Sequence, residues 1–365
     1  MKNNRFYGID LLRIFLMILI IMGHLFTHTN IRNELSNFSP KWFITWGFQS
    51  IIVCSVNCFV LITGYFTANA NKFYFKKIFQ IWGKVFYYSL LIFCLLILFG
   101  VIDFEWSGLI NTIFPVLTGQ YWFFTTYILL LLFIPFIKFL LDRLNDYMLK
   151  ILLIILIIVF YVLPVFSILF VQFDLSEGMG IMGFISLFII GFSLKRLNIS
   201  VSKTFCVIGL FINSAFILLS KIGLVIIIEQ LSLEVGSGLL YHYNTVFTLT
   251  NSILLLMLFK QINFNGKISK FIANINVSIF SVYLIHENPY IRKLIWSDSL
   301  CKKMINMNFI SYVAIVILIP IIIFIICIII DKIRILIQNL FFKTKVYRVV
   351  DSILTNFDEK LNDEF

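Results

Sequence analysis

Four polar side chains interrupt the first apolar stretch of the chain: Asp10, Arg13, His24 and His28. If residues 9–28 form a helix, Arg13 and His24 stand about 16 Å apart along its axis and within about 20° of the same face. The acid lies one turn before the arginine, and the second histidine one turn after the first, so all four form one polar stripe. Near neutral pH a histidine can accept a proton or carry a transferred group, and an arginine can hold an anion.

Two plainer interpretations of this stripe remain open. The acid and the arginine can form an ion pair at the inner membrane boundary, with the two histidines at the outer boundary. The H-x-x-x-H spacing of His24 and His28 also suits two metal ligands on one helix turn. A third ligand and a catalytic glutamate are absent from the motif, so we expect no metal. Apolar residues continue beyond His24, which favours a function for this histidine.

Membrane helices are the elements that must position these residues. The chain is 61% hydrophobic and 13% charged, with a mean hydropathy of +1.00, whereas soluble domains are nearer half apolar and a quarter charged. Windows of about 20 apolar residues predict an all-α polytopic membrane protein with about ten transmembrane helices. The predicted spans are 9–28, 43–67, 77–100, 121–141, 149–171, 179–194, 205–228, 242–260, 268–286 and 309–330.

The distribution of basic residues predicts the orientation of the chain. A net charge of +11 could suit a nucleic-acid-binding protein, but most of the 29 Lys and Arg residues fall in segments that are cytoplasmic when the N-terminus is inside. This pattern predicts that both termini are cytoplasmic, in a multi-pass protein of the cytoplasmic membrane with no nucleic-acid partner. The first apolar stretch has no cleavage site, so we expect a retained helix rather than a signal peptide.

All predicted spans fall in residues 1–330, and residues 331–365 form a basic cytoplasmic tail. Apolar residues recur in the tail at helical spacing beside lysines and acids, which predicts an amphipathic helix on the inner membrane surface. These residues are Val346, Val349, Val350, Ile353, Leu354, Phe357 and Leu361.

Four ordered stretches of the chain resemble one known family. Arg13 and His24 form an R-x10-H pattern, and the stretches CFVLITGYF (58–66), YWFFTTYILLLLFIPFI (121–137) and SVYLIHENPYI (281–291) follow in order. Together they resemble the acyltransferase 3 family of integral-membrane O-acyltransferases along nearly the whole chain, including the ten-helix layout. One difference lies at 72–84, where lysines replace the arginine-rich cluster of many family members, and lysine cannot make bidentate contacts to phosphate.

The resemblance implies that the protein moves an acyl group, usually acetyl, from cytoplasmic acyl-CoA to a hydroxyl of an extracytoplasmic or lipid-linked cell-surface polysaccharide. Acetyl-CoA would be the donor, and the glycan and membrane lipids the other partners. By motif match the catalytic residues are His24, its companion Arg13 and the late histidine His286. Asp10 joins them as a candidate because it lies one turn before Arg13 on the same face. His24 could act as a general base or carry the acyl group covalently.

The remaining site residues are assigned by their level in the membrane. For acyl-CoA we expect basic groups at the inner side: Arg13, Lys76, Lys77 and Lys84. For the acceptor we expect groups at the outer level: Tyr121, Trp122, His28 and Glu287. The lysines also fit ordinary positive-inside flanks and the aromatic residues ordinary interfacial anchors. Asn57, Asn276 and Tyr283, polar residues inside spans, are expected to bridge helices.

A protein of another class also fits part of this pattern. A transporter or flippase of lipid-linked sugars, or another membrane protein of polysaccharide assembly, would show many helices and buried polar groups. Such a transporter needs no anchor for coenzyme A and commonly has paired repeats, which this chain lacks. The R-x10-H pattern with basic residues at the inner side therefore favours the acyltransferase.

Overall fold

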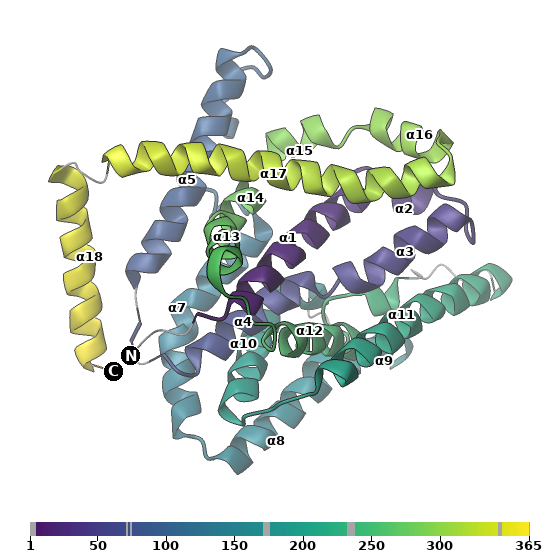
Figure 1. The fold of residues 1–365 in the computed structure, drawn as a ribbon, viewed down its shortest axis with the longest axis horizontal. Coiled ribbons are helices and arrows are strands. Elements are labelled where there is room, and N and C mark those ends of the chain that lie inside the picture. Colours follow the sequence, from purple (N-terminus) through teal and green to yellow (C-terminus); the bar gives the residue numbers. More distant parts are fainter. Residues whose placement is uncertain are drawn as a thin grey trace. The chain divides into compact units, whose positions relative to one another are not determined.

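The computed structural model describes residues 5–70, 72–73, 75–170, 176–231, 238–341 and 345–364. Every regular element in these ranges is a helix (Figure 1). The helices form two compact units, which the chain enters several times. The first unit comprises Met1–Ala68, Leu144–Val277 and Trp296–Ile322, and the second comprises Asn69–Arg143, Ser278–Ile295 and Ile323–Phe365.

The first unit contains the N-terminal helices and most of the central part of the chain. Its helices are α1 (Tyr7–His28), α2 (Ile31–Glu34), α3 (Pro40–Ile52), α4 (Ser55–Thr67), α8 (Asp146–Ile157), η1 (Ile158–Val162), α9 (Leu163–Phe170), η2 (Ser176–Gly178), α10 (Ile181–Arg196), α11 (Lys203–Leu231), η3 (Leu239–Tyr241), α12 (Val246–Phe259), α13 (Gly266–Asn276) and α16 (Asp298–Asn306).

Glycines allow two helices of this unit to pack backbone against backbone. A Cβ atom at Gly64 of α4 would lie 2.1 Å from the carbonyl oxygen of Phe188, and one at Gly191 of α10 would lie 2.2 Å from that of Leu61. Small residues at such crossings let membrane helices approach closely and gain van der Waals contact. The α4–α10 pair therefore depends on glycine at both positions.

Polar bonds supplement this packing. Asn57 Nδ2 of α4 donates to the backbone oxygen of Tyr243 at 2.8 Å, so Asn57 links α4 to the segment before α12 rather than to a second helix. At the start of α3, Pro40 occupies the first turn and the Ser39 side chain accepts from the backbone N–H of Trp42, a combination that starts helices efficiently.

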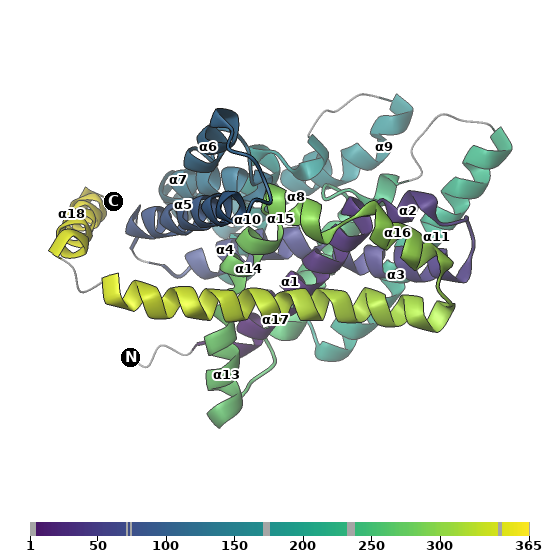
Figure 2. The ribbon, with the colours of Figure 1, turned by 90° about the horizontal axis from the view of Figure 1, so that it is seen from above.

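The second unit is built around α5 (Phe75–Leu98). Next to it pack α6 (Trp106–Ile113) and α7 (Trp122–Arg143) (Figures 1 and 2). The remaining members are α14 (Ile279–His286), α15 (Pro289–Ile295) and the tail helix α18 (Lys345–Glu364), and α17 (Phe309–Phe341) contributes to both units. The predicted tail helix is confirmed as a helix by α18.

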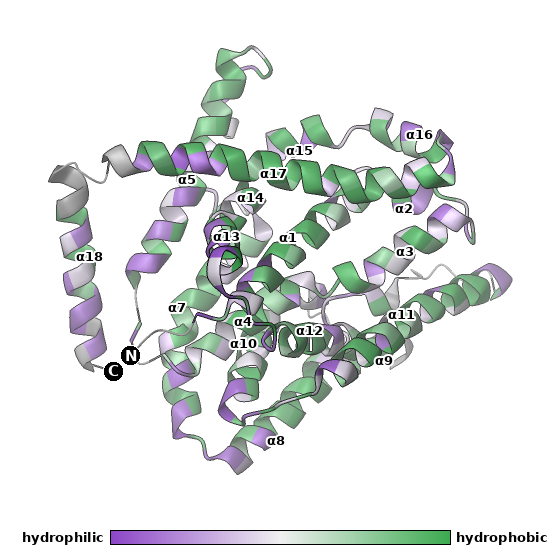
Figure 3. Ribbon diagram, in the orientation of Figure 1, coloured by the Kyte–Doolittle hydropathy of each residue, from purple (hydrophilic) through white to green (hydrophobic). Residues whose placement is uncertain are grey.

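Eight helices or helix pairs are long and apolar enough to cross a membrane among the described residues. They match eight of the ten predicted spans and confirm an all-α polytopic membrane protein; α11 and α17 are hydrophobic along most of their length (Figure 3). The other two predicted spans, 179–194 and 242–260, correspond to α10 and α12, which have 16 and 14 residues. These lengths fall short of the ~20 residues that a full crossing needs.

The helix that contains the last predicted span, 309–330, extends beyond it. α17 continues to Phe341, and the candidate membrane segment within it runs from Phe309 to Gln338. Asp331 lies inside this helix, where Tyr88 and Arg334 supply hydrogen-bond partners for its carboxylate.

Candidate active site

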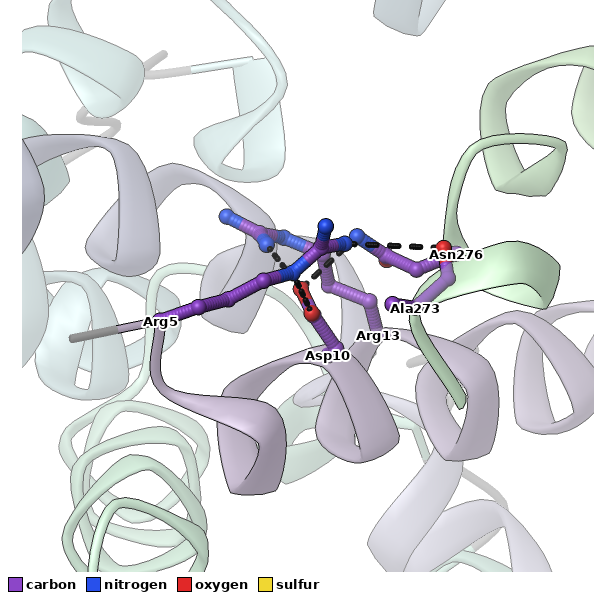
Figure 4. Close-up of polar contacts among 5 residues, drawn as sticks. All are labelled: Arg5, Asp10, Arg13, Ala273 and Asn276. Atoms are coloured by element: carbon purple, nitrogen blue, oxygen red, sulfur yellow. Dashed lines mark hydrogen bonds and ion pairs between the residues drawn. The ribbon is translucent and has the colours of Figure 1, made fainter. Parts of the chain in front are cut away.

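Asp10 is the centre of a buried polar junction at the start of α1 (Figure 4). Its side chain is 5% exposed. The carboxylate accepts from Arg5 Nε at 2.5 Å, from Arg13 Nη1 at 3.1 Å and from Asn276 Nδ2 at 2.7 Å. A carboxylate removed from water needs charged or hydrogen-bonded partners, and here both oxygens have them. In this arrangement Asp10 accepts hydrogen bonds from both arginines and positions Arg13.

Two further helices are held against the start of α1, one by the junction and one by close backbone packing. Asn276 ends α13, so its bond to Asp10 ties α13 to α1 and confirms the bridging role expected of this residue. At Gly8 a Cβ atom would lie 2.1 Å from the carbonyl oxygen of Phe259, at the end of α12. Only glycine permits this approach. Arg13 is therefore carried by a helix that neighbours hold on two sides.

The Arg13 guanidinium remains partly accessible to a ligand. Its side chain is 30% exposed, and its central carbon lies 5.9 Å from the centroid of the Phe66 ring. A guanidinium has five N–H donors in a rigid plane, and the bond to Asp10 uses one of them. A positioned and partly exposed arginine of this kind is suited to binding a phosphate or carboxylate.

The two histidines of the stripe lie at the other end of the same helix. α1 runs from Tyr7 to His28, which confirms the predicted helix and places Arg13 and His24 on one face by helix geometry. The rings of His24 and His28 are half-buried, with centroids 5.2 Å apart. An imidazole at this depth can accept or deliver a proton, unlike its apolar neighbours.

In the second unit, His286 ends α14 and is fully buried. Its Nδ1 lies 2.6 Å from the backbone oxygen of Val282. This contact requires the proton on Nδ1, so Nε2 carries the lone pair in the neutral ring. The Tyr283 ring stands edge-on to the imidazole at 6.3 Å between centroids. The geometry thus fixes both the ring orientation and the tautomer of His286.

Tyr121 and Asn288 link the end of α14 to the start of α7. The Tyr121 hydroxyl donates to the backbone oxygen of Leu284 at 3.1 Å and accepts from Asn288 Nδ2 at 3.0 Å. Because its ring is 1% exposed, Tyr121 is placed to hold α14 rather than to stack on a sugar. Trp122, the next residue, is half-buried at the start of α7.

Glu287, the other acceptor-binding candidate of this unit, is 5% exposed and forms an ion pair with Arg292 at 2.9 Å. The pair lies directly after His286 in sequence. A carboxylate with an arginine partner stays ionised, so Glu287 offers a hydrogen-bond acceptor rather than a proton.

The predicted donor-binding lysines of α5 differ in their surroundings. Lys76 Nζ pairs with Asp351 of α18 at 2.7 Å and donates to Thr355 at 3.2 Å. On the same helix end, the Asp358 carboxylate accepts from the backbone N–H of Phe75 at 2.7 Å. The tail helix thus occupies the N-terminus of α5, which would otherwise attract an anion. Lys77 is exposed.

A buried ionic network beside Lys84 was missed by sequence reasoning. The Asp331 carboxylate of α17 accepts from the Tyr88 hydroxyl of α5 at 2.6 Å and from Arg334 Nε at 2.7 Å. The acid is fully buried and the arginine side chain is 6% exposed, and both interact electrostatically with the half-buried Lys84. The spacing D-x-x-R directly after an apolar run could have indicated it, because helix continuation puts both residues on neighbouring turns.

The predicted site residues occur in both units, and each group is described within its own unit. In the first unit, Asp10 and Arg13 are bonded to each other and lie on one helix with His24 and His28. In the second unit, His286, Glu287 and Tyr121 lie around the end of α14, and Lys76, Lys77 and Lys84 lie on α5.

Comparison with known proteins gives one result. Residues 6–331 match a family model described as an acyltransferase domain. No curated protein and no solved structure matched the chain.

Proposed function

Because the chain belongs to the acyltransferase 3 family, we propose that this membrane acyltransferase moves an acetyl group from cytoplasmic acetyl-CoA to a hydroxyl of a cell-surface glycan. The acceptor would be an extracytoplasmic polysaccharide or a lipid-linked oligosaccharide. The membrane would be the cytoplasmic membrane, with both termini inside.

The observation that carries this proposal is the single helix α1. Near its start, the Asp10 junction holds a partly exposed Arg13, and near its end stands the half-buried His24. About 16 Å of helix separates the two residues. An acyl-CoA is a long, thin molecule with phosphates at one end and a thioester at the other. Arg13 is suited to the phosphates and His24 to the thioester.

The reaction then follows from the chemistry of imidazole. The His24 ring accepts the proton of the acceptor hydroxyl, and the hydroxyl oxygen attacks the thioester carbonyl carbon. A C–O bond forms, the C–S bond breaks, and the departing thiolate takes the proton from the imidazolium. General base catalysis of this kind contributes a factor of about 10² to 10⁴.

The second set of residues would serve the acceptor. His286 has a fixed tautomer with its lone pair on Nε2, and Glu287 is an ionised acceptor. Such groups can accept hydrogen bonds from sugar hydroxyls. In this unit Trp122 is a further candidate for acceptor contacts, and Tyr121 would position α14. The sequence also makes His28 of α1 a candidate.

The test is the release of coenzyme A from acetyl-CoA by membranes that contain the full chain, with cell-wall glycan added as acceptor. We expect His24→Ala to lower the rate about 10² to 10⁴-fold. His242→Ala is the matched control, since this half-buried histidine lies outside both sets, and it should keep the wild-type rate. An unchanged rate in His24→Ala would remove this histidine from the mechanism. No release by wild type with any surface glycan would favour the transporter.

A further inference from the structure

Basic side chains from three helices surround the last turn of α4. The Tyr65 ring, 6% exposed, has Lys195 Nζ at 5.3 Å and Lys260 Nζ at 5.7 Å from its centroid. The next residue is Phe66, and the central carbon of the Arg13 guanidinium lies 5.9 Å from the centroid of its ring. The end of α10, the end of α12 and the start of α1 thus bring positive charge to one helix turn of the first unit.

Backbone contacts fix the position of the Lys260 ammonium. Lys260 Nζ donates to the backbone oxygen of Ile199 at 2.9 Å, and Gln261 Nε2 donates to that of Val201 at 2.9 Å. These bonds tie the segment after α10 to the end of α12. Lys195 and Lys260 interact as like charges, so the fold holds together two groups that repel each other.

Several other basic side chains have a carboxylate partner. These pairs are Arg5 and Arg13 with Asp10, Lys76 with Asp351, Lys138 with Asp142, Arg196 with Asp146, Arg292 with Glu287 and Arg334 with Asp331. Among the described residues, no carboxylate lies within 4.0 Å of the Lys195 or Lys260 ammonium. Contact with the Tyr65 ring stabilises the two cations only weakly. An anion bound by both ammoniums would reduce their repulsion.

We propose that Lys195 and Lys260 form a phosphate-binding site, and that the phosphate belongs to the acyl donor. This assignment rests on the proposed function, in which the donor is a coenzyme A thioester. The donor carries several phosphates, and Arg13 on the adjoining side of the α4 turn would hold another of them. The engagement of Lys76 by Asp351 and Thr355 supports this location over the start of α5.

The experiment measures the dissociation constant of coenzyme A by calorimetry, with the full chain in phosphatidylcholine nanodiscs. In the double variant Lys195→Gln/Lys260→Gln the constant should rise about tenfold or more, because two charged contacts to phosphate are lost. Lys150→Gln, which neutralises an exposed lysine of α8, should bind as wild type does. Pantetheine, which has no phosphate, should bind wild type and double variant equally, which also shows that the variant is folded.

Each remaining outcome separates this inference from the proposed function. Coenzyme A binding that the double substitution leaves unchanged would overturn the phosphate site and leave the proposed donor intact. Absence of coenzyme A binding by wild type would overturn both. In nanodiscs with phosphatidylglycerol, loss of bound anionic lipid in the double variant without a change in coenzyme A affinity would assign the site to a lipid headgroup and overturn the donor assignment. Lysine-dependent binding without transfer to any glycan would uphold the site and contradict the proposed acceptor.

Discussion

The same local motif, an aspartate with an arginine three residues later, occurs at two buried positions with different surroundings. Asp10 and Arg13 open α1 in the first unit, and Asp331 and Arg334 lie in α17 in the second unit. Both acids are almost fully buried. The arginines differ, since the side chain of Arg13 is 30% exposed and that of Arg334 is 6% exposed.

The two carboxylates differ in their hydrogen-bond partners. Both oxygens of Asp10 have partners, and one of these partners, Asn276, belongs to another helix, α13. Asp331 places its two bonds on Oδ1, while Oδ2 has no hydrogen-bond partner among the described residues. One motif therefore leaves its arginine partly exposed, whereas the other links α5 to α17 through a buried arginine and acid.

Removing the acid of the second motif should have the largest effect on stability. Asp331→Ala leaves Arg334 buried without its counter-ion, which typically costs about 3–5 kcal/mol. Thermal unfolding of the full chain in detergent measures the loss. An effect no larger than that of an exposed pair would show that Arg334 is solvated in the folded protein and would remove the contrast between the motifs.

Asp10→Asn should destabilise less, by roughly 2–3 kcal/mol, because Arg5 and Arg13 are partly exposed and water can solvate them. Its larger effect should be on the donor, since an unanchored Arg13 binds phosphate less well. We expect the KM for acetyl-CoA to rise more in Asp10→Asn than in Asp331→Asn. The reverse order would exchange the roles given to the two motifs.

These roles could be predicted from the sequence only in part. The R-x10-H pattern predicted α1 and the shared face of Arg13 and His24, because helix geometry is local. It could not show that Asn276 completes the junction at Asp10, since partners 266 positions apart are set by tertiary packing. The shared turn of α4, where Lys195 and Lys260 meet Tyr65, was missed for the same reason.

Hydropathy predicted the apolar segments but not the limits of the helices. The predicted spans 179–194 and 242–260 correspond to α10 and α12, whose 16 and 14 residues are fewer than a typical crossing needs. The predicted last span ended at residue 330, and α17 continues beyond it, where Tyr88 and Arg334 supply buried partners for Asp331. The pairing of Lys76 with the tail helix carries no local signal, because it depends on how α18 docks on α5.

Tyr88→Phe is a smaller change at the second motif, Asp331 and Arg334. It removes one hydrogen bond to the buried carboxylate and leaves the Arg334 bond in place. A hydrogen bond to a charged group contributes about 1.5 kcal/mol at the lower end of the usual range. Unfolding in the same detergent should show this loss with an unchanged KM for acetyl-CoA. A raised KM instead would give the second motif a part in donor binding.

The smallest effect is expected at an exposed pair on α7. Lys138 and Asp142 form an ion pair in which the acid is 47% exposed, and such pairs contribute about 0–1 kcal/mol. Asp142→Asn should therefore unfold close to wild type and serve as the baseline for the three variants above. A loss comparable with that of Asp10→Asn would show that burial does not explain the ranking.

In the proposed reaction, α1 carries the catalytic histidine of an acetyl transfer to the cell surface. The O-acetyl content of the surface polysaccharide tests this role in cells that express wild type or His24→Ala at equal membrane levels. We expect O-acetyl groups with wild type and their loss with His24→Ala. Equal acetylation in both would contradict the role of His24, and the absence of acetylation with wild type would contradict the proposed reaction.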